Sequence, residues 1–386
     1  MARFQYLLRF GIITLFIAWR LLDFFIAQIA TYSIPYLGHF SHPSTLAIYN
    51  IPQWIKGFAQ FDGIFYLRIA QNGYSQFEQA FFPLYPLLIN ALSPIFGGNH
   101  LIVSLIVANL SFLAALSVFR KYLLNILPAN QQKNIYFILL FLLLFPTSFF
   151  FGASYTESLF FLLLVSTFYF LHKKNFWLVA SFAFLASLTR FVGVFLFIPI
   201  LASLLQATGY RLQATRKYLS IVSPFLGLGA YMLYLWQSTG DSFAFFTSQA
   251  AFGAGRSTQM VLVPQVIYRY LKIILTSTVN LGYFVALLEL VVFLFVLTVL
   301  VVQLRDLLRS EDKGLLGLNL FSIANLLVPT LTGTLGSIPR YGLLSLSFFV
   351  YIGMLKSAKI KLLLCIIFAL LHVGLVSLFI QGYFVS

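Results

Sequence analysis

Residues 60–88 hold the side chains of this chain that are best suited to chemistry. The stretch reads QFDGIFYLRIAQNGYSQFEQAFFPLYPLL and follows the first very apolar segment. It contains Asp62 and Glu78, two of only nine acidic residues, together with Arg68, several amides and three tyrosines. Ionisable groups close to a bilayer are costly and tend to mark function. We therefore expect a substrate to bind and react in this stretch.

Asp62 has two possible roles that the sequence leaves open. It follows Phe61 and precedes a short amphipathic stretch that is suited to lying along a membrane surface. An Asp at such a place can be the N-cap of a helix, accepting hydrogen bonds from backbone N–H groups. It can also be a general base that deprotonates an acceptor hydroxyl, which contributes roughly 10²–10⁴ in rate. One residue can fill both roles.

Three further acceptor side chains are candidates for recognising sugar hydroxyl groups. Glu78 and Gln79 lie just before the sequence FFPLYP, and the alternative for Glu78 is a carboxylate solvated in a loop. Glu157, in GASYTESLFF, lies where one apolar segment ends and the next begins. It can complement a helix dipole beside Thr156, or it can face a polar cavity, since carboxylates near hydrocarbon seldom face lipid.

Two arginines are candidates for binding phosphate. Arg190, in SLTRFVG, and Arg340, in SIPRYG, both fall at expected helix ends on the outer face. Arginine binds phosphate in a bidentate manner and stays charged. The alternative for each is snorkelling, in which the long side chain reaches the membrane interface.

Other ionisable residues are expected to be structural. Arg20 and Asp23, three residues apart in the first apolar segment, should neutralise each other. Glu289 is alone in a long apolar segment and has no evident partner. No HExxH, D-x-D or clustered-His pattern signals a metal, and no glycine-rich phosphate loop is present. Cys365, the only cysteine, allows no intrachain disulfide.

Composition indicates a membrane protein with many helices. Of the 386 residues, 61% are hydrophobic and 9% are charged, and the mean hydropathy is +0.95. Such values exclude a soluble globular domain, and the long apolar runs exclude a β-barrel. We expect a single integral-membrane domain over 1–386, an all-α bundle of about eleven transmembrane helices. The expected spans are approximately 9–31, 100–119, 135–152, 155–171, 176–190, 191–207, 218–236, 279–304, 315–332, 341–355 and 362–381.

The basic residues predict the orientation in the membrane. The net charge is +15, and Lys and Arg gather between apolar runs, which favours anionic lipid over nucleic acid as the reason for the charge. With a cytoplasmic N-terminus, sixteen of the 24 basic residues fall inside and seven outside, as the positive-inside rule requires. Two long loops, about 32–99 and 237–278, then face outside. Within the first, Pro83, Pro86 and Pro94 favour a re-entrant or interfacial segment over a twelfth span at 81–97.

Several motifs resemble one enzyme family. FDGIFYLRIAQNGY followed by FEQAFFPLYPLL resembles the signature of the GPI mannosyltransferase 2 (PIG-V) family, roughly Trp-Asp-x-x-x-(Phe/Tyr)-x-x-Ile-Ala-x-x-Gly-Tyr and then Phe-Phe-Pro-x-(Phe/Tyr)-Pro. FPTSFFFGASYTESLFFLL, LASLTRFVG and SIPRYGLLSLSFF resemble its later motifs, in the same order over about 60–350. Phe61 replaces the family's usual Trp and leaves Asp62 in place. The second outer loop matches no motif of the family.

The resemblance implies a GT-C glycosyltransferase whose large first outer loop carries short interfacial helices. Such an enzyme takes a sugar, typically mannose, from a polyprenyl- or dolichyl-phosphate donor on the non-cytoplasmic face, without a metal. Asp62 matches the family's presumed general base. The family adds the second mannose of the GPI anchor in eukaryotes, and a prokaryotic relative would glycosylate another lipid-linked glycan or acceptor. The membrane would be the endoplasmic reticulum in the first case and the plasma membrane in the second.

These observations predict one inverting displacement. Asp62 takes the proton of the acceptor hydroxyl, which attacks the anomeric carbon, and the polyprenyl phosphate leaves against Arg190 and Arg340. Glu157, Glu78 and Gln79 orient sugar hydroxyls. Tyr74 and Tyr85 are the expected stacking wall, and Arg68 is a further substrate-binding candidate. A flippase or transporter of lipid-linked saccharides, or a non-catalytic subunit with the same fold, is the alternative.

Overall fold

The structure is a computed structural model that describes residues 2–38, 42, 44–205, 214–252, 256–257, 259–309 and 313–385. Over these residues the chain forms helices and no strand, so the all-α prediction is confirmed. Five helices are long and apolar enough to cross a membrane, which supports a multi-pass membrane protein. They cover Gly11–Ser33, His100–Ile126, Thr215–Thr239, Leu281–Arg309 and Ala358–Ile380.

Other expected spans are shorter or broken. The helix expected over 135–152 ends at Leu144, because Phe145 precedes Pro146 and takes an extended conformation with ψ 140°. The span expected over 341–355 is wrong as one helix, since Ile338–Gly342 and Leu346–Gly353 are separate. The segment expected at 81–97 forms a helix over Leu84–Leu92 and a 3-10 turn over Ser93–Phe96, which is too short to cross.

The contacts divide the chain into two compact units, and the prediction of a single domain stays a prediction. The first unit comprises residues 1–75, 83–169 and 357–385. Its helices are α1 (Ala2–Ser33), α2 (Ser44–Ala47), α3 (Gln53–Lys56), η1 (Gly57–Ala59), α4 (Asp62–Asn72), α5 (Leu84–Leu92), η3 (Ser93–Phe96), α6 (His100–Ile126), η4 (Gln132–Asn134), α7 (Ile135–Leu144), η5 (Ser148–Gly152), most of α8 (Glu157–His172), and α18 (Ala358–Ile380).

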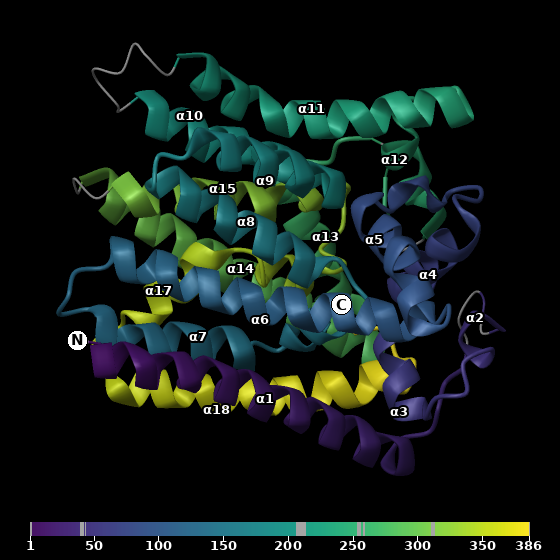
Figure 1. Cartoon of the computed structure of the whole chain (residues 1–386). Helices are drawn as coiled ribbons and strands as arrows, with labels where there is room; N and C mark the ends of the chain where they lie inside the picture. The colour runs from purple at the N-terminus through teal and green to yellow at the C-terminus, as the bar shows by residue number, and fades with distance from the viewer. Residues whose placement is uncertain are drawn as a thin grey trace. The chain divides into compact units, whose positions relative to one another are not determined.

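Within the first unit, helices from opposite ends of the sequence pack together. α1 lies alongside α18, and α6 and α7 pack against this pair (Figure 1). The short helices α4 and α5 pack on each other and on α6. The core is aromatic: Phe112 stacks on Phe151 with ring centroids 4.4 Å apart, and Trp19 meets Phe112 edge-on at 4.9 Å. Aromatic pairs of this kind stabilise a core beyond the area that they bury.

The second unit comprises residues 76–82 and 170–356. Its helices are η2 (Glu78–Ala80), α9 (Phe176–Thr189), η6 (Phe191–Leu196), α10 (Phe197–Leu205), α11 (Ala214–Thr239), α12 (Ala244–Thr247), η8 (Ser248–Phe252), α13 (Val263–Thr276), α14 (Leu281–Arg309), α15 (Lys313–Thr330), α16 (Ile338–Gly342) and α17 (Leu346–Gly353). α9 packs along α11, and α14 packs against α15, α16 and α17. Gly227 allows the close approach of α11 to α9, because a Cβ there would fall on the Phe184 carbonyl.

Candidate functional site

The backbone immediately before Asp62 has an unusual conformation. Phe61 is the N-cap of α4, with φ 57° and ψ −120°, and Asp62 is the first helical residue. Of the two alternatives for Asp62, the N-cap role therefore falls to the preceding residue, Phe61. A bulky residue with positive φ is strained. Two rings hold it in place, since Phe61 stacks on Phe379 at 5.4 Å and meets Phe384 edge-on at 5.5 Å.

Two hydrogen bonds join the Asp62 segment to the Glu157 segment within the first unit. Ser154 N donates to Phe58 O at 2.9 Å, and the Tyr155 hydroxyl donates to Gln60 O at 2.8 Å. Glu157, three residues after Ser154, begins α8 and is fully buried. Asp62 is half-buried. The two segments that directly precede Asp62 and Glu157 are therefore hydrogen-bonded to each other, and each of these acidic residues begins the helix that follows its segment.

The remaining candidates of the first unit differ in exposure. Arg68 and Tyr74 are half-buried, on α4 and just after it. Tyr85 is fully buried, its hydroxyl donates to Ser104 O at 2.9 Å, and its ring meets that of Tyr66 edge-on at 5.3 Å. Stacking on a sugar needs an accessible ring face. This placement favours a packing role for Tyr85 over contact with a sugar.

Glu78 and Gln79 are buried in the second unit. Glu78 begins η2, directly after Phe77 in the left-handed conformation (φ 69°), and only 3% of Glu78 is exposed. The alternative of a solvated loop carboxylate is therefore wrong. The Tyr231 hydroxyl anchors this segment through the carbonyls of Gln79 and Phe81, at 2.8 and 3.2 Å. A carboxylate is costly to bury without compensating polar contacts, so the burial of Glu78 indicates that its surroundings stabilise it.

Arg190 and the Arg340 segment lie together in the second unit. Arg190 is the C-cap of α9, and its guanidinium carbon lies 5.0 Å from the ring centroid of Tyr341. Arg340 lies beside Tyr341 on the short helix α16. Arg190 and Arg340 are 9% and 7% exposed, whereas snorkelling would leave the guanidinium groups exposed. The burial of both side chains counts against the snorkelling alternative.

A network around Glu289, which the sequence left without a partner, lies next to the Arg340 helix. The Tyr270 hydroxyl donates to Glu289 Oε2 at 2.6 Å, and it accepts from Leu335 N at 3.1 Å. Burial and then the neighbouring Glu289 raise the pKa of Tyr270 above its ordinary value, so its hydroxyl remains a donor. Only the lone carboxylate in an apolar segment signalled this network in the sequence.

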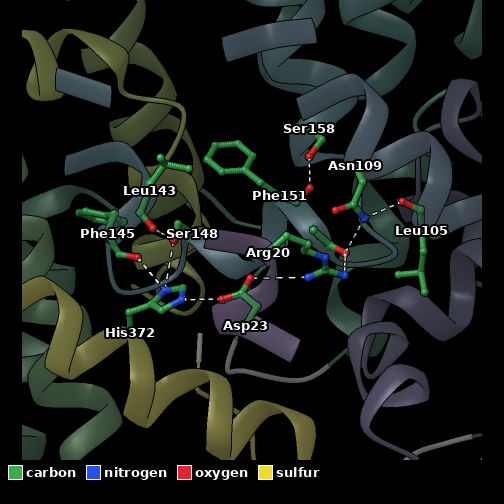
Figure 2. Close-up of polar contacts among 11 residues, drawn as sticks. Arg20, Asp23, Leu105, Asn109, Leu143, Phe145, Ser148, Phe151, Ser158 and His372 are labelled. Atoms are coloured by element: carbon green, nitrogen blue, oxygen red, sulfur yellow. Dashed lines mark hydrogen bonds and ion pairs between the residues drawn. The ribbon is translucent and has the colours of Figure 1, made fainter. Parts of the chain in front are cut away.

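A second buried network joins α1 to α18 in the first unit (Figure 2). The predicted Arg20–Asp23 pair is present at 3.5 Å, and His372 Nε2 lies 2.7 Å from Asp23 Oδ1. Arg20 also donates to Gly152 O at 2.8 Å, and His372 Nδ1 lies 3.1 Å from the Ser148 hydroxyl.

This network is not arranged as a catalytic triad, although it contains the residue types of one. Ser148, His372 and Asp23 are all buried, which keeps a substrate away from them. The Ser148 hydroxyl donates to Leu143 O, so its proton is directed at this carbonyl and away from His372 Nδ1. A hydroxyl held in this way is not poised for attack.

The described residues contain no group of three or more His, Cys, Asp or Glu side chains that could hold a metal ion. The candidate residues fall in both units: Asp62, Arg68, Tyr74, Tyr85 and Glu157 in the first, and Glu78, Gln79, Arg190 and Arg340 in the second. Comparison of the chain with models of protein families found no match, and comparison with curated proteins found none either.

Proposed function

We propose that the chain is a membrane glycosyltransferase that moves mannose from a polyprenyl- or dolichyl-phosphate donor to a lipid-linked glycan or similar acceptor. Asp62 is the base for the acceptor hydroxyl in this reaction. The leaving phosphate is held by Arg190 and Arg340, and Glu157 with the Glu78–Gln79 pair binds sugar hydroxyls. The resemblance of the motifs to the PIG-V family suggests this chemistry, and the environment of the residues supports it.

One observation carries the proposal. Five non-glycine residues among those described have positive φ, and three of them, Phe61, Phe77 and Ser337, are the N-caps of α4, η2 and α16. These are the helices that carry Asp62, Glu78 and Arg340. Such conformations cost of order 1–3 kcal/mol each and gather at active sites, where they orient functional groups. Their coincidence with residues chosen from the sequence for their chemistry supports a catalytic role.

The test is sugar transfer by membranes that contain the protein. Wild-type membranes should transfer mannose from polyprenyl-phosphate mannose, and Asp62→Asn should lower the turnover by roughly two to four decades. The matched control is Asp241→Asn, the same chemical change at a half-buried Asp that precedes α12. It should leave turnover unchanged. Turnover of Asp62→Asn within about threefold of wild type would remove Asp62 from the mechanism.

The proposed site faces the non-cytoplasmic side, with a cytoplasmic N-terminus. Single cysteines placed at Tyr74 and at Lys217 distinguish the two faces, since the basic residues assign Tyr74 to the outside and Lys217 to the inside. A membrane-impermeant thiol reagent should label the first position and spare the second. The reverse labelling would contradict an outward-facing active site.

One observation favours the second candidate, a flippase or transporter of lipid-linked saccharides. Asp23 and His372 lie well inside two of the long apolar helices, and charged networks at such depth are common in transporters. The two functions differ in their need for this network. A transporter should lose substrate movement in Asp23→Asn at normal protein level, whereas a glycosyltransferase should keep its transfer rate per folded molecule.

A further inference from the structure

A clamp in the second unit determines where α16 begins. The carboxylate of Glu289, on α14, accepts from the Tyr270 hydroxyl at 2.6 Å and lies near the backbone N–H of Ser337. Ser337 is the N-cap of α16 and has φ 68°, a left-handed conformation that a residue with a Cβ seldom adopts. Glu289 thus lies beside the one strained residue from which the Arg340 helix starts, and it orients the Tyr270 hydroxyl that bonds to the preceding backbone.

The Tyr270 hydroxyl restrains the backbone just before Ser337. It accepts from Leu335 N at 3.1 Å and contacts the Thr334 hydroxyl at 3.1 Å. Thr334 in turn accepts from Gly336 N at 3.0 Å. The segment 334–337 therefore packs against two buried side chains, Tyr270 of α13 and Glu289 of α14, which are 7% and 4% exposed.

The second outer loop is bonded to residues 331–333, which directly precede this segment. Ser257 N donates to Thr332 O at 2.8 Å, and Val261 N donates to Leu331 O at 2.9 Å. Arg269 donates to Gly333 O at 3.1 Å. Gly333 has φ 92°, and a Cβ there would lie 2.8 Å from the Arg269 Nη1 atom, so this contact requires glycine.

We propose that Glu289 and Tyr270 are positioning residues that set Arg340 for the phosphate of the lipid donor. The inference rests on the proposed function and deepens it, because it gives the second outer loop, which matches no family motif, a role at the donor end of the site. Arg340 N donates to Ser337 O at 3.0 Å, so a shift at Ser337 is passed to Arg340 within one helical turn. Misplacing a binding group by about 1 Å can cost about a hundredfold in rate.

The first measurement is hydrogen exchange of the backbone, which needs no activity. Tyr270→Phe removes only the hydroxyl, and with it the contacts to Leu335 N, Glu289 and Thr334. Exchange in a peptide covering 333–342 should become about two- to tenfold faster, because Leu335 N loses its acceptor. The control is Ser347→Ala, which removes a 2.7 Å bond to Gln303 on the same helix α14 and should leave that peptide unchanged. Unchanged exchange in Tyr270→Phe would overturn the clamp.

The second measurement separates positioning from general stability. The KM for polyprenyl-phosphate mannose should rise about two- to tenfold in Tyr270→Phe, while the KM for the acceptor stays as in wild type. Glu289→Ala should have the larger effect. Glu289→Gln, which keeps an acceptor oxygen for the Tyr270 hydroxyl, should restore part of the donor affinity.

The outcomes distinguish the two hypotheses. Faster exchange with an unchanged donor KM would mean that the clamp exists but does not position Arg340, which overturns the inference and leaves the proposed function standing. If Tyr270→Phe raised the KM for donor and for acceptor equally, and Ser347→Ala did the same, the cause would be a loosened fold. That result would also overturn the positioning role of Glu289 and Tyr270. Absence of any transfer by wild-type membranes would remove the proposed function, and the positioning role would fall with it.

Discussion

Replacing Phe61 tests whether strain is stored directly before Asp62. Phe61→Ala and Phe61→Gly both lose the ring contacts with Phe379 and Phe384, so their difference reports on the backbone alone. Ala retains the Cβ that clashes at φ 57° and ψ −120°, at a cost of about 1–3 kcal/mol, and Gly does not. Glycine also gives the unfolded chain more conformational entropy, which by itself makes the Gly variant less stable than the Ala variant by about 0.4–1 kcal/mol. We therefore expect Phe61→Gly to be the more stable variant by about 1 kcal/mol.

Phe65 provides the matched control, because it lies four residues later on the same helix α4 with ordinary helical geometry. There Phe65→Gly should be less stable than Phe65→Ala by about 1 kcal/mol, the usual cost of glycine within a helix. The difference in stability between the Gly and Ala variants therefore has opposite signs at Phe61 and Phe65, and the two differences lie about 2 kcal/mol apart. The assay is unfolding of the purified protein by titration with SDS from a mild detergent. If glycine is the less stable residue at both sites, Phe61 is not strained and the argument from strained helix starts loses its main support.

Three other perturbations give expected outcomes. Asp23→Asn leaves Arg20 buried without its counter-charge and should cost about 3–5 kcal/mol in the same titration; a loss below about 1 kcal/mol would contradict the ion pair. Gly152→Ala places a Cβ 2.8 Å from the Arg20 Cζ atom, and forcing that side chain aside should cost about 1–3 kcal/mol. Stability equal to wild type would show that Arg20 is not held there. Arg190→Lys and Arg340→Lys should each raise the donor KM or lower kcat by about tenfold, with little effect of EDTA. Strong inhibition by EDTA, reversed by Mg²⁺, would instead assign the leaving phosphate to a metal.

The sequence was most informative where the signal is local. Long apolar runs predicted the five helices able to cross a membrane, and the spacing of three predicted the Arg20–Asp23 pair, since both depend on neighbours within a few turns. The end of α7 was also readable, because Pro146 forces Phe145 out of the helical conformation. The expected span over 135–152 ignored that signal.

Features that depend on distant residues were not readable. Nothing in the sequence marks Phe61 for positive φ, because packing by Phe379 and Phe384, and not a glycine, determines it. The partners of Glu289 come from Tyr270 and from the Ser337 backbone, which local patterns do not reveal. The break between α16 and α17 lies inside the run 341–355, which is apolar apart from a few glycine and serine residues. Hydropathy gives the length of such a run and says nothing of its continuity as a helix.

The bond between Asp23 and His372 has a consequence for biosynthesis. The two residues are 349 positions apart, so at roughly 5–20 residues per second the ribosome needs about 20–70 s between them. During this time Asp23 of α1 lacks its His372 partner, which has not been synthesised. Arg20, one helical turn away, carries the charge that can neutralise the Asp23 carboxylate for insertion. The short-range pair thus serves as an interim state, and the arrival of α18 completes the packing. A chain that stops before His372 therefore lacks this partner of Asp23.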